Sequence, residues 1–185
     1  MIDDIMEDAE SRMNKAIEHL NSDFAGMRAG RANPAMVDKL MVNYYGTPTP
    51  LNQIANINVP EARLLIINPW DKGSIVDIEK AIMKSDLGVN PNNDGNVIRI
   101  NLPQLTEDRR KDLVKVVKKR AEEGKVAIRN IRREANDLLK VSEKDKLISE
   151  DASKKGLDDI QKVTDKFIKD IDYILQLKEK EIMEV

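Results

Sequence analysis

The sequence contains no cysteine and only one histidine, His19, among its 185 residues. Without cysteine the chain can form neither disulfides nor thiolate metal sites. A single histidine cannot supply a histidine metal cluster, and His19 lies among residues with helical periodicity. We therefore expect His19 to have a solvated or packing role. The sequence predicts no metal and no other cofactor.

Long apolar runs and aromatic residues are also scarce. No stretch approaches the roughly 20 apolar residues that a membrane-spanning helix needs. The N-terminal residues are acidic and periodic, unlike a secretory signal, so a cytoplasmic protein with no membrane partner is expected. Aromatic residues make up 3% of the chain and charged residues 35%. That balance suits long exposed helices better than a globular enzyme.

The sequence has none of the common catalytic motifs. It contains no Gly-x-Ser-x-Gly nucleophile elbow, no glycine-rich loop before a lysine and no His-Glu-x-x-His. Its many carboxylates fall on predicted exposed helices, whereas general acid–base chemistry needs a carboxylate in a desolvated pocket. We therefore predict no catalytic residue, and a protein that is not an enzyme.

Three segments have the periodicity of long amphipathic helices. Apolar residues recur at steps of three and four over residues 2–28, over residues 107–144, where Leu138 is expected to be buried, and again after Ser149. Thr106 and Ser149 each precede acidic residues and are expected to cap their helices. Because each helix must bury its apolar stripe against the others, a three-helix bundle is predicted.

The segment between the first and second of these helices is rich in β-forming residues. Strands are expected at 40–45, 53–59, 63–67 and 97–102, with Gly46–Pro50 as the turn after the first. Ser74 is expected to cap a short helix, with Asp77 completing a variant capping box, and Gly88 to close it. Trp70 and the pair Tyr44-Tyr45 are expected to fill the core of this region, with a binding platform as the alternative.

The predicted fold class is therefore α+β. An elongated three-helix bundle, formed by residues 1–29 and 106–185, carries a small inserted α/β domain of residues 30–105. Two short connections between the parts allow a hinge. The hinge residues are expected to be Ala29, Gly30, Arg31, Pro103, Gln104 and Leu105.

Positive charge is concentrated in one part of the chain. Residues 108–146 carry 14 basic and 8 acidic side chains, a net charge of +6, although the whole chain has a net charge of −2. Helical spacing places six of these cations in one stripe, which only Glu122 interrupts, and Arg133 lies four residues after Arg129. The stripe consists of Lys111, Lys115, Lys118, Lys125, Arg129 and Arg132.

Like charges stacked on one helix face repel each other by roughly a few tenths of a kcal/mol per pair. Binding to a polyanion offsets this repulsion, because each contacted phosphate releases counterions. The alternative is a solvated face whose cations pair with acids of neighbouring helices. For the lysines at 111–118 both readings stay open, and for Arg129, Arg132 and Arg133 RNA binding is favoured. The stripe has no aromatic residue, which favours backbone contact with folded RNA over base stacking. Arg28 and Arg31 are either a second RNA contact or simply solvated.

Distinctive motifs along the whole chain support a family assignment. They include Gly30-Arg31-Ala32 with Pro34, Tyr45-Gly46-Thr47-Pro48-Thr49-Pro50-Leu51, Ser85-Asp86-Leu87-Gly88, Val126-Ala127-Ile128-Arg129-Asn130-Ile131-Arg132-Arg133 and Ser149-Glu150-Asp151. In these motifs the chain resembles the bacterial ribosome recycling factor family, from Met1 to Val185. One departure is Ala29, where the family often has threonine.

The resemblance implies an L-shaped molecule of roughly tRNA size, with the bundle as its long arm. It implies a translation factor that binds the post-termination ribosome and, with elongation factor G and GTP, separates the subunits for recycling. The elongation factor would hydrolyse the GTP. Arg110, Arg129, Arg132 and Arg133 would meet RNA of the large ribosomal subunit, and the inserted domain would swing and meet the elongation factor. We expect a monomer. The competing hypothesis is a coiled-coil structural or chaperone-like module that binds proteins.

Overall fold

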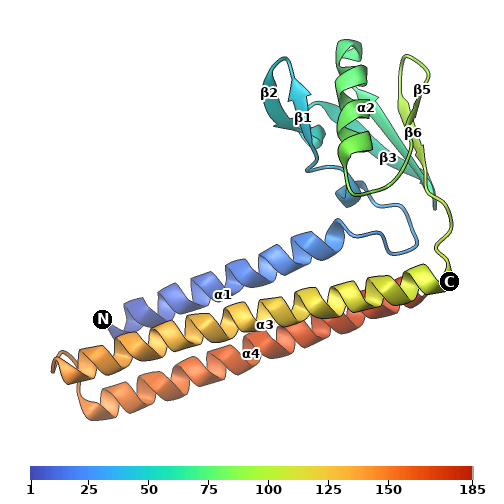
Figure 1. Cartoon of the computed structure of the whole chain (residues 1–185). Coiled ribbons are helices and arrows are strands. Elements are labelled where there is room, and N and C mark those ends of the chain that lie inside the picture. The colour runs from blue at the N-terminus through green and yellow to red at the C-terminus, as the bar shows by residue number, and fades with distance from the viewer. Residues whose placement is uncertain (185) are drawn as a thin grey trace. The chain divides into compact units, whose positions relative to one another are not determined.

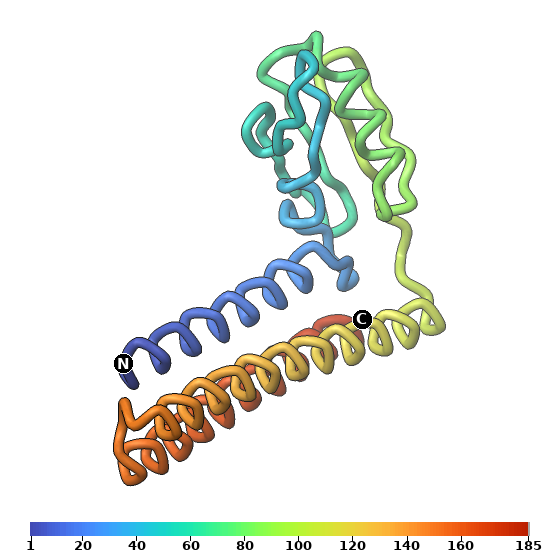
Figure 2. Tube along the Cα trace, turned by 60° about the vertical axis from the view of Figure 1, so that its left-hand side comes forward, coloured from blue at the N-terminus to red at the C-terminus, as the bar shows by residue number. Residues whose placement is uncertain are grey.

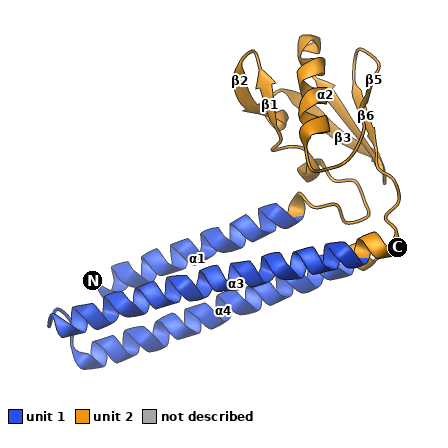
Figure 3. Cartoon of the chain, in the orientation of Figure 1, with its two compact units in different colours: residues 1–24, 111–180 blue, residues 25–110, 181–185 orange. Residues whose placement is uncertain are grey.

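The computed structural model describes residues 1–184, which form two compact units (Figure 3). The bundle unit comprises Met1–Phe24 and Lys111–Lys180. The sheet unit comprises Ala25–Arg110 together with the residues from Glu181 onward. The first is helical and the second is built around a β-sheet, so the predicted α+β class is confirmed.

Three long helices lie side by side in the bundle unit (Figures 1 and 2). They are α1 (Ile2–Ala25), α3 (Glu107–Lys144) and α4 (Glu150–Met183). Their predicted apolar stripes face one another, and Met13, Ile128, Ile160 and Ile171 are fully buried. Apolar burial of this kind contributes roughly 25 cal/mol for each Å² removed from water, so the stripes are the main force holding the helices together.

The ends of these helices follow the capping chemistry of the sequence. Thr106 Oγ1 accepts a hydrogen bond from the Arg109 N–H at 3.1 Å, and Ser149 Oγ accepts one from the Ala152 N–H at 3.0 Å. Both predicted caps are therefore confirmed. Helix α1 ends at Ala25, short of the predicted residue 28, because the glycine that follows disfavours the helical backbone.

The bundle core has two departures from the predicted stripes. Leu138 is 53% exposed, and Leu139 is fully buried in its place. The prediction was wrong by one position because 3.6 residues per turn do not match a seven-residue repeat over a helix of this length. On α4 the aliphatic stem of Lys178 occupies a buried position between Ile171 and Ile182, where an apolar residue would be expected.

The sheet unit contains a four-stranded antiparallel sheet in the order β3-β4-β6-β5, with helix α2 against it (Figure 1). Strands β1 and β2 pair with each other in a separate two-stranded ribbon. Apolar residues of α2, of the sheet and of the ribbon form one continuous core. The bounds are β1 (Met41–Tyr44), β2 (Thr47–Pro50), β3 (Ala55–Glu61), β4 (Leu64–Pro69), α2 (Ile75–Lys84), β5 (Asn92–Asn93) and β6 (Ile98–Asn101).

The β1–β2 ribbon corrects the prediction that Gly46–Pro50 is a turn. The turn consists of only Tyr45 and Gly46, whose φ angles are 49° and 85°. Two successive residues with positive φ give the mirror-image turn that best matches the twist of a hairpin. The following residues then return as strand β2, paired with β1 from Tyr44↔Thr47 to Met41↔Pro50. Prolines are tolerated in β2 because it is an edge strand.

The start of α2 also differs from the predicted capping box. Ser74 makes no capping hydrogen bond, and its Oγ instead donates to the Asp71 carbonyl oxygen at 2.6 Å. Asp71 is the residue that caps, since its carboxylate accepts from the Gly73 N–H at 2.9 Å at the start of a 3₁₀ turn before α2. Helix α2 ends at Lys84, before the predicted Gly88. The start of the helix after Ser74 and its interior were predicted correctly, whereas the capping hydrogen bond and the C-terminal end were not.

Two aromatic residues predicted to fill the core are at the surface. Trp70 is 63% exposed and Tyr45 is 73% exposed, whereas Tyr44 packs partly against the core. The Tyr45 hydroxyl donates a hydrogen bond to Asp71, which raises the pKa of Tyr45 and lowers that of Asp71. The core is filled instead by aliphatic side chains such as Leu65, Ile78 and Ile98.

Candidate RNA-binding surface

Helix α3 carries most of the predicted RNA-binding residues. One face of it is buried against the other two helices by seven apolar side chains. The rest of its circumference divides into a flank next to α1, a flank next to α4 and an outward face, as the interhelical contacts described below establish. The buried residues are Leu113, Val117, Ala121, Ile128, Ile131, Ala135 and Leu139.

Several cations of the predicted stripe are paired with α4. Lys125 Nζ lies 2.5 Å from an Asp172 carboxylate oxygen, and its side chain is only 17% exposed. Lys118 Nζ lies 3.9 Å from a Glu179 oxygen, and Arg132 Nη1 donates to the Gln161 side-chain oxygen at 3.3 Å. These three predicted residues therefore hold α3 to α4, and the alternative reading of paired helix faces describes Lys118 and Lys125.

Four other predicted cations, Lys111, Lys115, Arg129 and Arg133, lie at the surface of α3. Arg129 is half-exposed and reaches Glu122 on its own helix at 3.4 Å, and Arg133 is exposed with only a long 3.5 Å contact to Asn130. Lys111 and Lys115 are exposed. Within the residues that the structure describes, Lys115 has no carboxylate within 4.0 Å. Ion pairs between exposed groups are worth at most about 1 kcal/mol, so Arg129 can exchange Glu122 for another anion.

The flank of α3 next to α1 is neutralised by ion pairs of both polarities with α1. Arg120 Nη1 lies 3.3 Å from Asp23, and Arg12 of α1 lies 2.5 Å from Glu134 of α3. The Arg12 guanidinium holds the pKa of Glu134 below its usual range. Because both flanks are neutralised by neighbouring helices, the remaining positive charge of α3 lies on its outward face.

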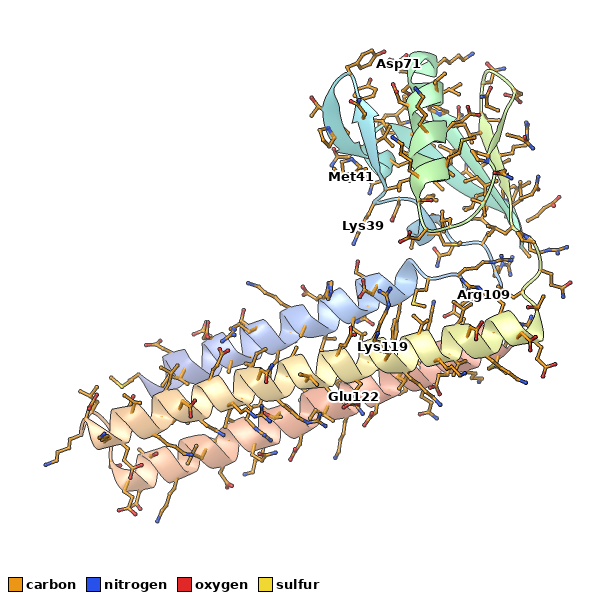
Figure 4. The ribbon with its side chains drawn as sticks, in the orientation of Figure 1. Lys39, Met41, Asp71, Arg109, Lys119 and Glu122 are labelled. Carbon is orange, nitrogen blue, oxygen red and sulfur yellow. The ribbon has the colours of Figure 1, made fainter. Side chains whose placement is uncertain are left out.

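The outward face includes lysines that the sequence reasoning missed. Lys119, Lys140 and Lys144 are exposed and share this side of α3 with Lys115 and Arg133; Lys119 and Glu122 are labelled in Figure 4. Lys119 follows Lys115 by four residues, and Lys140 follows Arg133 by seven, so helical spacing alone would have found them. We call Lys111, Lys115, Lys119, Arg129, Arg133, Lys140 and Lys144 the outward basic face.

The predicted residues outside the bundle unit lie in the sheet unit. Arg28 is half-buried, and this burial, followed by the charges of Arg63 and Arg109, lowers its pKa. Arg31 is exposed, and Arg110 is half-buried near the start of α3. Arg28 and Arg31 belong to the sheet unit, whereas the paired stripe residues belong to the bundle unit.

The predicted hinge residues form two irregular segments of the sheet unit. Gly30 has a φ of 86°, which allows a tight bend between Ala29 and Arg31. Ala29 and Leu105 are buried, whereas Pro103 and Gln104 are exposed. The lone His19 is exposed on α1, 3.7 Å from Asp23, as a solvated residue.

The geometry offers neither a membrane span nor a metal centre in the described chain. None of the helices in residues 1–184 is long and apolar enough to cross a membrane. Over the same residues, no group of three or more histidine, aspartate or glutamate side chains is arranged to hold a metal ion.

Comparison with known proteins identifies the family. The model of the ribosome recycling factor family matches residues 20–183. Ribosome-recycling factors of Syntrophomonas wolfei and Carboxydothermus hydrogenoformans are 71% and 59% identical to the chain, each over the full length of both proteins. A solution structure of a ribosome recycling factor matches with a TM-score of 0.81 and 44% identity, over 100% of this chain and 98% of the other.

A second solved structure describes a relative in a larger assembly. It presents models for the T. thermophilus ribosome recycling factor and the E. coli elongation factor G bound to the E. coli post-termination complex. It matches with a TM-score of 0.67 and 49% identity over the full length of both chains. With a family model over residues 20–183 and full-length relatives above 50% identity, this chain belongs to the ribosome recycling factor family.

Proposed function

We propose that this chain is a translation factor that binds the post-termination ribosome and, with elongation factor G and GTP, promotes its disassembly so that the subunits are recycled. Family membership over the full length supports this proposal. The relative bound with elongation factor G to a post-termination complex supports the choice of partners. The protein acts as a monomer in the cytoplasm and has no catalytic activity of its own, because the elongation factor hydrolyses the GTP.

The observation that carries the proposal is the outward basic face of α3. Neighbouring helices neutralise both flanks of α3, yet cations remain along its exposed side. Like charges on one face destabilise a helix slightly, so this face is better explained by a polyanionic partner. The RNA of the large ribosomal subunit is such a partner, and folded RNA is recognised mostly through its shape and its backbone.

We assign the RNA contacts to the predicted set, with different weights. Arg129, Arg132 and Arg133 contribute most, since guanidiniums can hold phosphates with two parallel hydrogen bonds. Lys118 and Lys125 contribute less, because each must leave a carboxylate of α4 to reach RNA. The full set is Arg28, Arg31, Arg110, Lys111, Lys115, Lys118, Lys125, Arg129, Arg132 and Arg133.

The inserted domain supplies the moving part in this proposal. Residues 30–105 meet the elongation factor and swing about the hinge segments 29–31 and 103–105, while residues 1–29 and 106–185 stay anchored on the ribosome. A disulfide between engineered cysteines that locks the two segments should abolish subunit recycling and leave ribosome binding intact. Full recycling activity in the locked protein would contradict the hinge.

Cosedimentation with purified large subunits over a salt series tests the RNA contacts. Binding should weaken steeply with salt, because each phosphate contact releases counterions. Replacing Arg129 and Arg132 with glutamate should weaken binding by roughly 2–5 kcal/mol. Lys166→Glu with Lys169→Glu, which makes the same charge change on exposed residues of α4, is the matched control and should bind nearly as the parent does.

Two results of this experiment would contradict the proposal. If the affinity for the large subunit depended neither on salt nor on the charge reversal on α3, the result would favour a coiled-coil module that recognises proteins through its helices. An equal loss in the α4 control would mean that total charge, rather than the α3 surface, determines binding.

A further inference from the structure

Arginines from distant parts of the chain surround one cavity of the sheet unit. The cavity has a volume of about 590 Å³ and is lined by Arg31, Arg63 and Arg110 together with Glu181 and Glu184. Arg28 is not a lining residue, but it precedes the lining Ala29 in the chain and is close enough to Arg63 and Arg109 for both charges to act on its guanidinium. All of these residues belong to the sheet unit. They come from the segment after α1, the β3–β4 turn and the ends of α3 and α4.

The backbone explains why these distant residues meet. The Ala32 N–H donates a hydrogen bond to the Ala62 carbonyl at 2.7 Å, and the Leu102 N–H donates one to the Arg63 carbonyl at 2.8 Å. The β3–β4 turn is therefore held by both irregular segments, one on each side of it in the sequence. These bonds fix Arg63 next to the segment that carries Arg28 and Arg31.

The hydrogen-bonding groups of this cluster are incompletely used. The Nε and Nη2 atoms of Arg28 are buried and have no hydrogen-bond partner among the residues that the structure describes, and the same holds for Nε of Arg110. Buried donors without partners destabilise the fold, and charged donors do so more strongly. Nε and Nη2 lie on the same edge of a guanidinium and together match two oxygens of a phosphate or carboxylate.

The charges around the cavity are also unbalanced. Three guanidiniums, those of Arg31, Arg63 and Arg110, and two carboxylates line the cavity, which leaves a net charge of +1. Arg28, whose charge interacts with those of Arg63 and Arg109, adds further positive charge close to the lining. Arg109 is labelled at the start of α3 in Figure 4. Burial and mutual repulsion both disfavour such a cluster in the isolated protein. An anion in the cavity would offset both costs.

We propose that Arg28, Arg63 and Arg110 bind a phosphate group in this cavity, with the Nε–Nη2 edge of Arg28 donating to two of its oxygens. Arg31 and Arg109 add positive charge, which Glu181 and Glu184 offset only in part. The phosphate belongs either to an RNA backbone or to a free phosphorylated molecule. Binding of an RNA phosphate rests on the proposed function. Phosphate binding in the cavity as such does not depend on that function.

Titration of the full chain with inorganic pyrophosphate tests the cavity. The Nε–H resonances of Arg28 and Arg110 in a nitrogen-15 NMR spectrum should shift with a common saturation curve, and chloride at equal ionic strength should not reproduce the shift. Arg28→Gln should weaken pyrophosphate binding by about tenfold or more, the value of one charge-assisted hydrogen bond. Lys84→Gln, the same charge change on an exposed residue of α2, should leave binding unchanged.

Stability provides a second readout of the same variants. Arg28→Gln removes a half-buried cation from among like charges, so its thermal midpoint without pyrophosphate should be no lower than that of the parent. If this variant does not fold, Arg63→Gln in the exposed turn takes its place. Shifts without saturation, or equal losses in Arg28→Gln and Lys84→Gln, would overturn the phosphate site.

The same variants distinguish the two sources of phosphate and separate this inference from the proposed function. Weaker binding of Arg28→Gln to large ribosomal subunits assigns the phosphate to RNA, whereas unchanged subunit binding assigns it to a free phosphorylated ligand. The glutamate variants of Arg129 and Arg132 should lose subunit binding and keep pyrophosphate binding. Absence of saturable pyrophosphate binding overturns the cavity proposal, even if α3 binds the subunit as proposed.

Discussion

Different kinds of contact stabilise the interior of the bundle unit and that of the sheet unit. The bundle has long apolar seams that include small and polar residues, such as Gly124, Gly156 and Thr164, and ion pairs link its helices across the surface. The sheet unit has one continuous aliphatic cluster, and its polar bonds are concentrated in turns, as at Asp94. The bundle thus presents its charge along a rod, while the sheet unit concentrates its polar hydrogen bonds in turns.

The substitution with the largest expected effect on stability removes core volume from the sheet unit. Ile78 on α2 is fully buried, so Ile78→Ala should destabilise the sheet unit by roughly 2–5 kcal/mol. Val76→Ala, on the same helix at a residue that is 57% exposed, should change stability by less than about 0.5 kcal/mol. Hydrogen exchange should show the loss in sheet-unit amides and full protection in the bundle. Equal loss in both units would mean that they unfold as one.

A pair of glycines gives an intermediate test within the bundle. A Cβ at Gly156 would lie 3.1 Å from both methyl groups of the buried Leu139, whereas one at Gly124 would be 3.4 Å from Ile171 and 3.8 Å from Leu20. Gly156→Ala should be destabilising by about 1 kcal/mol, because overpacking exceeds the gain in helix propensity. Gly124→Ala should be stabilising by up to about 1 kcal/mol. Thermal unfolding of both variants measures the two stability changes. If both changes had the same sign, close packing around Gly156 would not be what distinguishes the two positions.

The smallest expected effect concerns a turn of the sheet unit and appears in acid. Backbone N–H groups of Val97 and Asn96 and the guanidinium of Arg99 hold the pKa of Asp94 well below its usual range, with the Val97 bond as the largest cause. The folded pKa lies below the unfolded value of about 4, so this stabilisation is complete above pH 4 and is lost as the pH falls further.

Asp94→Asn should therefore lower stability near neutral pH and flatten the acid limb of the stability curve, so that variant and parent converge at the lowest pH. Urea unfolding between pH 6 and pH 2 measures this difference. Asp86→Asn, at an exposed carboxylate outside the turn, is the control and should follow the parent at every pH. A constant offset for Asp94→Asn over the whole range would assign the effect to lost packing rather than to ionisation.

The same contrast explains what could be predicted from the sequence. Helix caps depend on neighbours in the chain, so Thr106 and Ser149 were predicted correctly. Tyr45 was assigned to the core by hydrophobicity, but a turn with positive φ places it outside. Leu138 was misplaced because small errors in phase accumulate along a long helix.

Contacts of the candidate site that cross between elements were beyond the sequence pattern. The spacing of Lys118 and Lys125 predicted a common stripe, but Glu179 and Asp172, which pair with them, lie more than 40 residues away. Arg63 gave no signal at all, because only the backbone bonds of its turn bring it next to Arg28. Lys119 did give a signal through its helical spacing, which the prediction overlooked.

The two prolines of strand β2 have a consequence for how the protein behaves at high concentration. In a hairpin with a two-residue turn, Tyr44 and Thr47 exchange hydrogen bonds, and the pairing alternates along the ribbon. Pro48 and Pro50 therefore occupy positions where a backbone N–H would point away from β1. Because proline has no backbone N–H, the outer edge of β2 lacks these hydrogen-bond donors. The outer edge of β2 cannot recruit a further strand from another molecule, so the ribbon resists growth into an aggregate without any helix covering it.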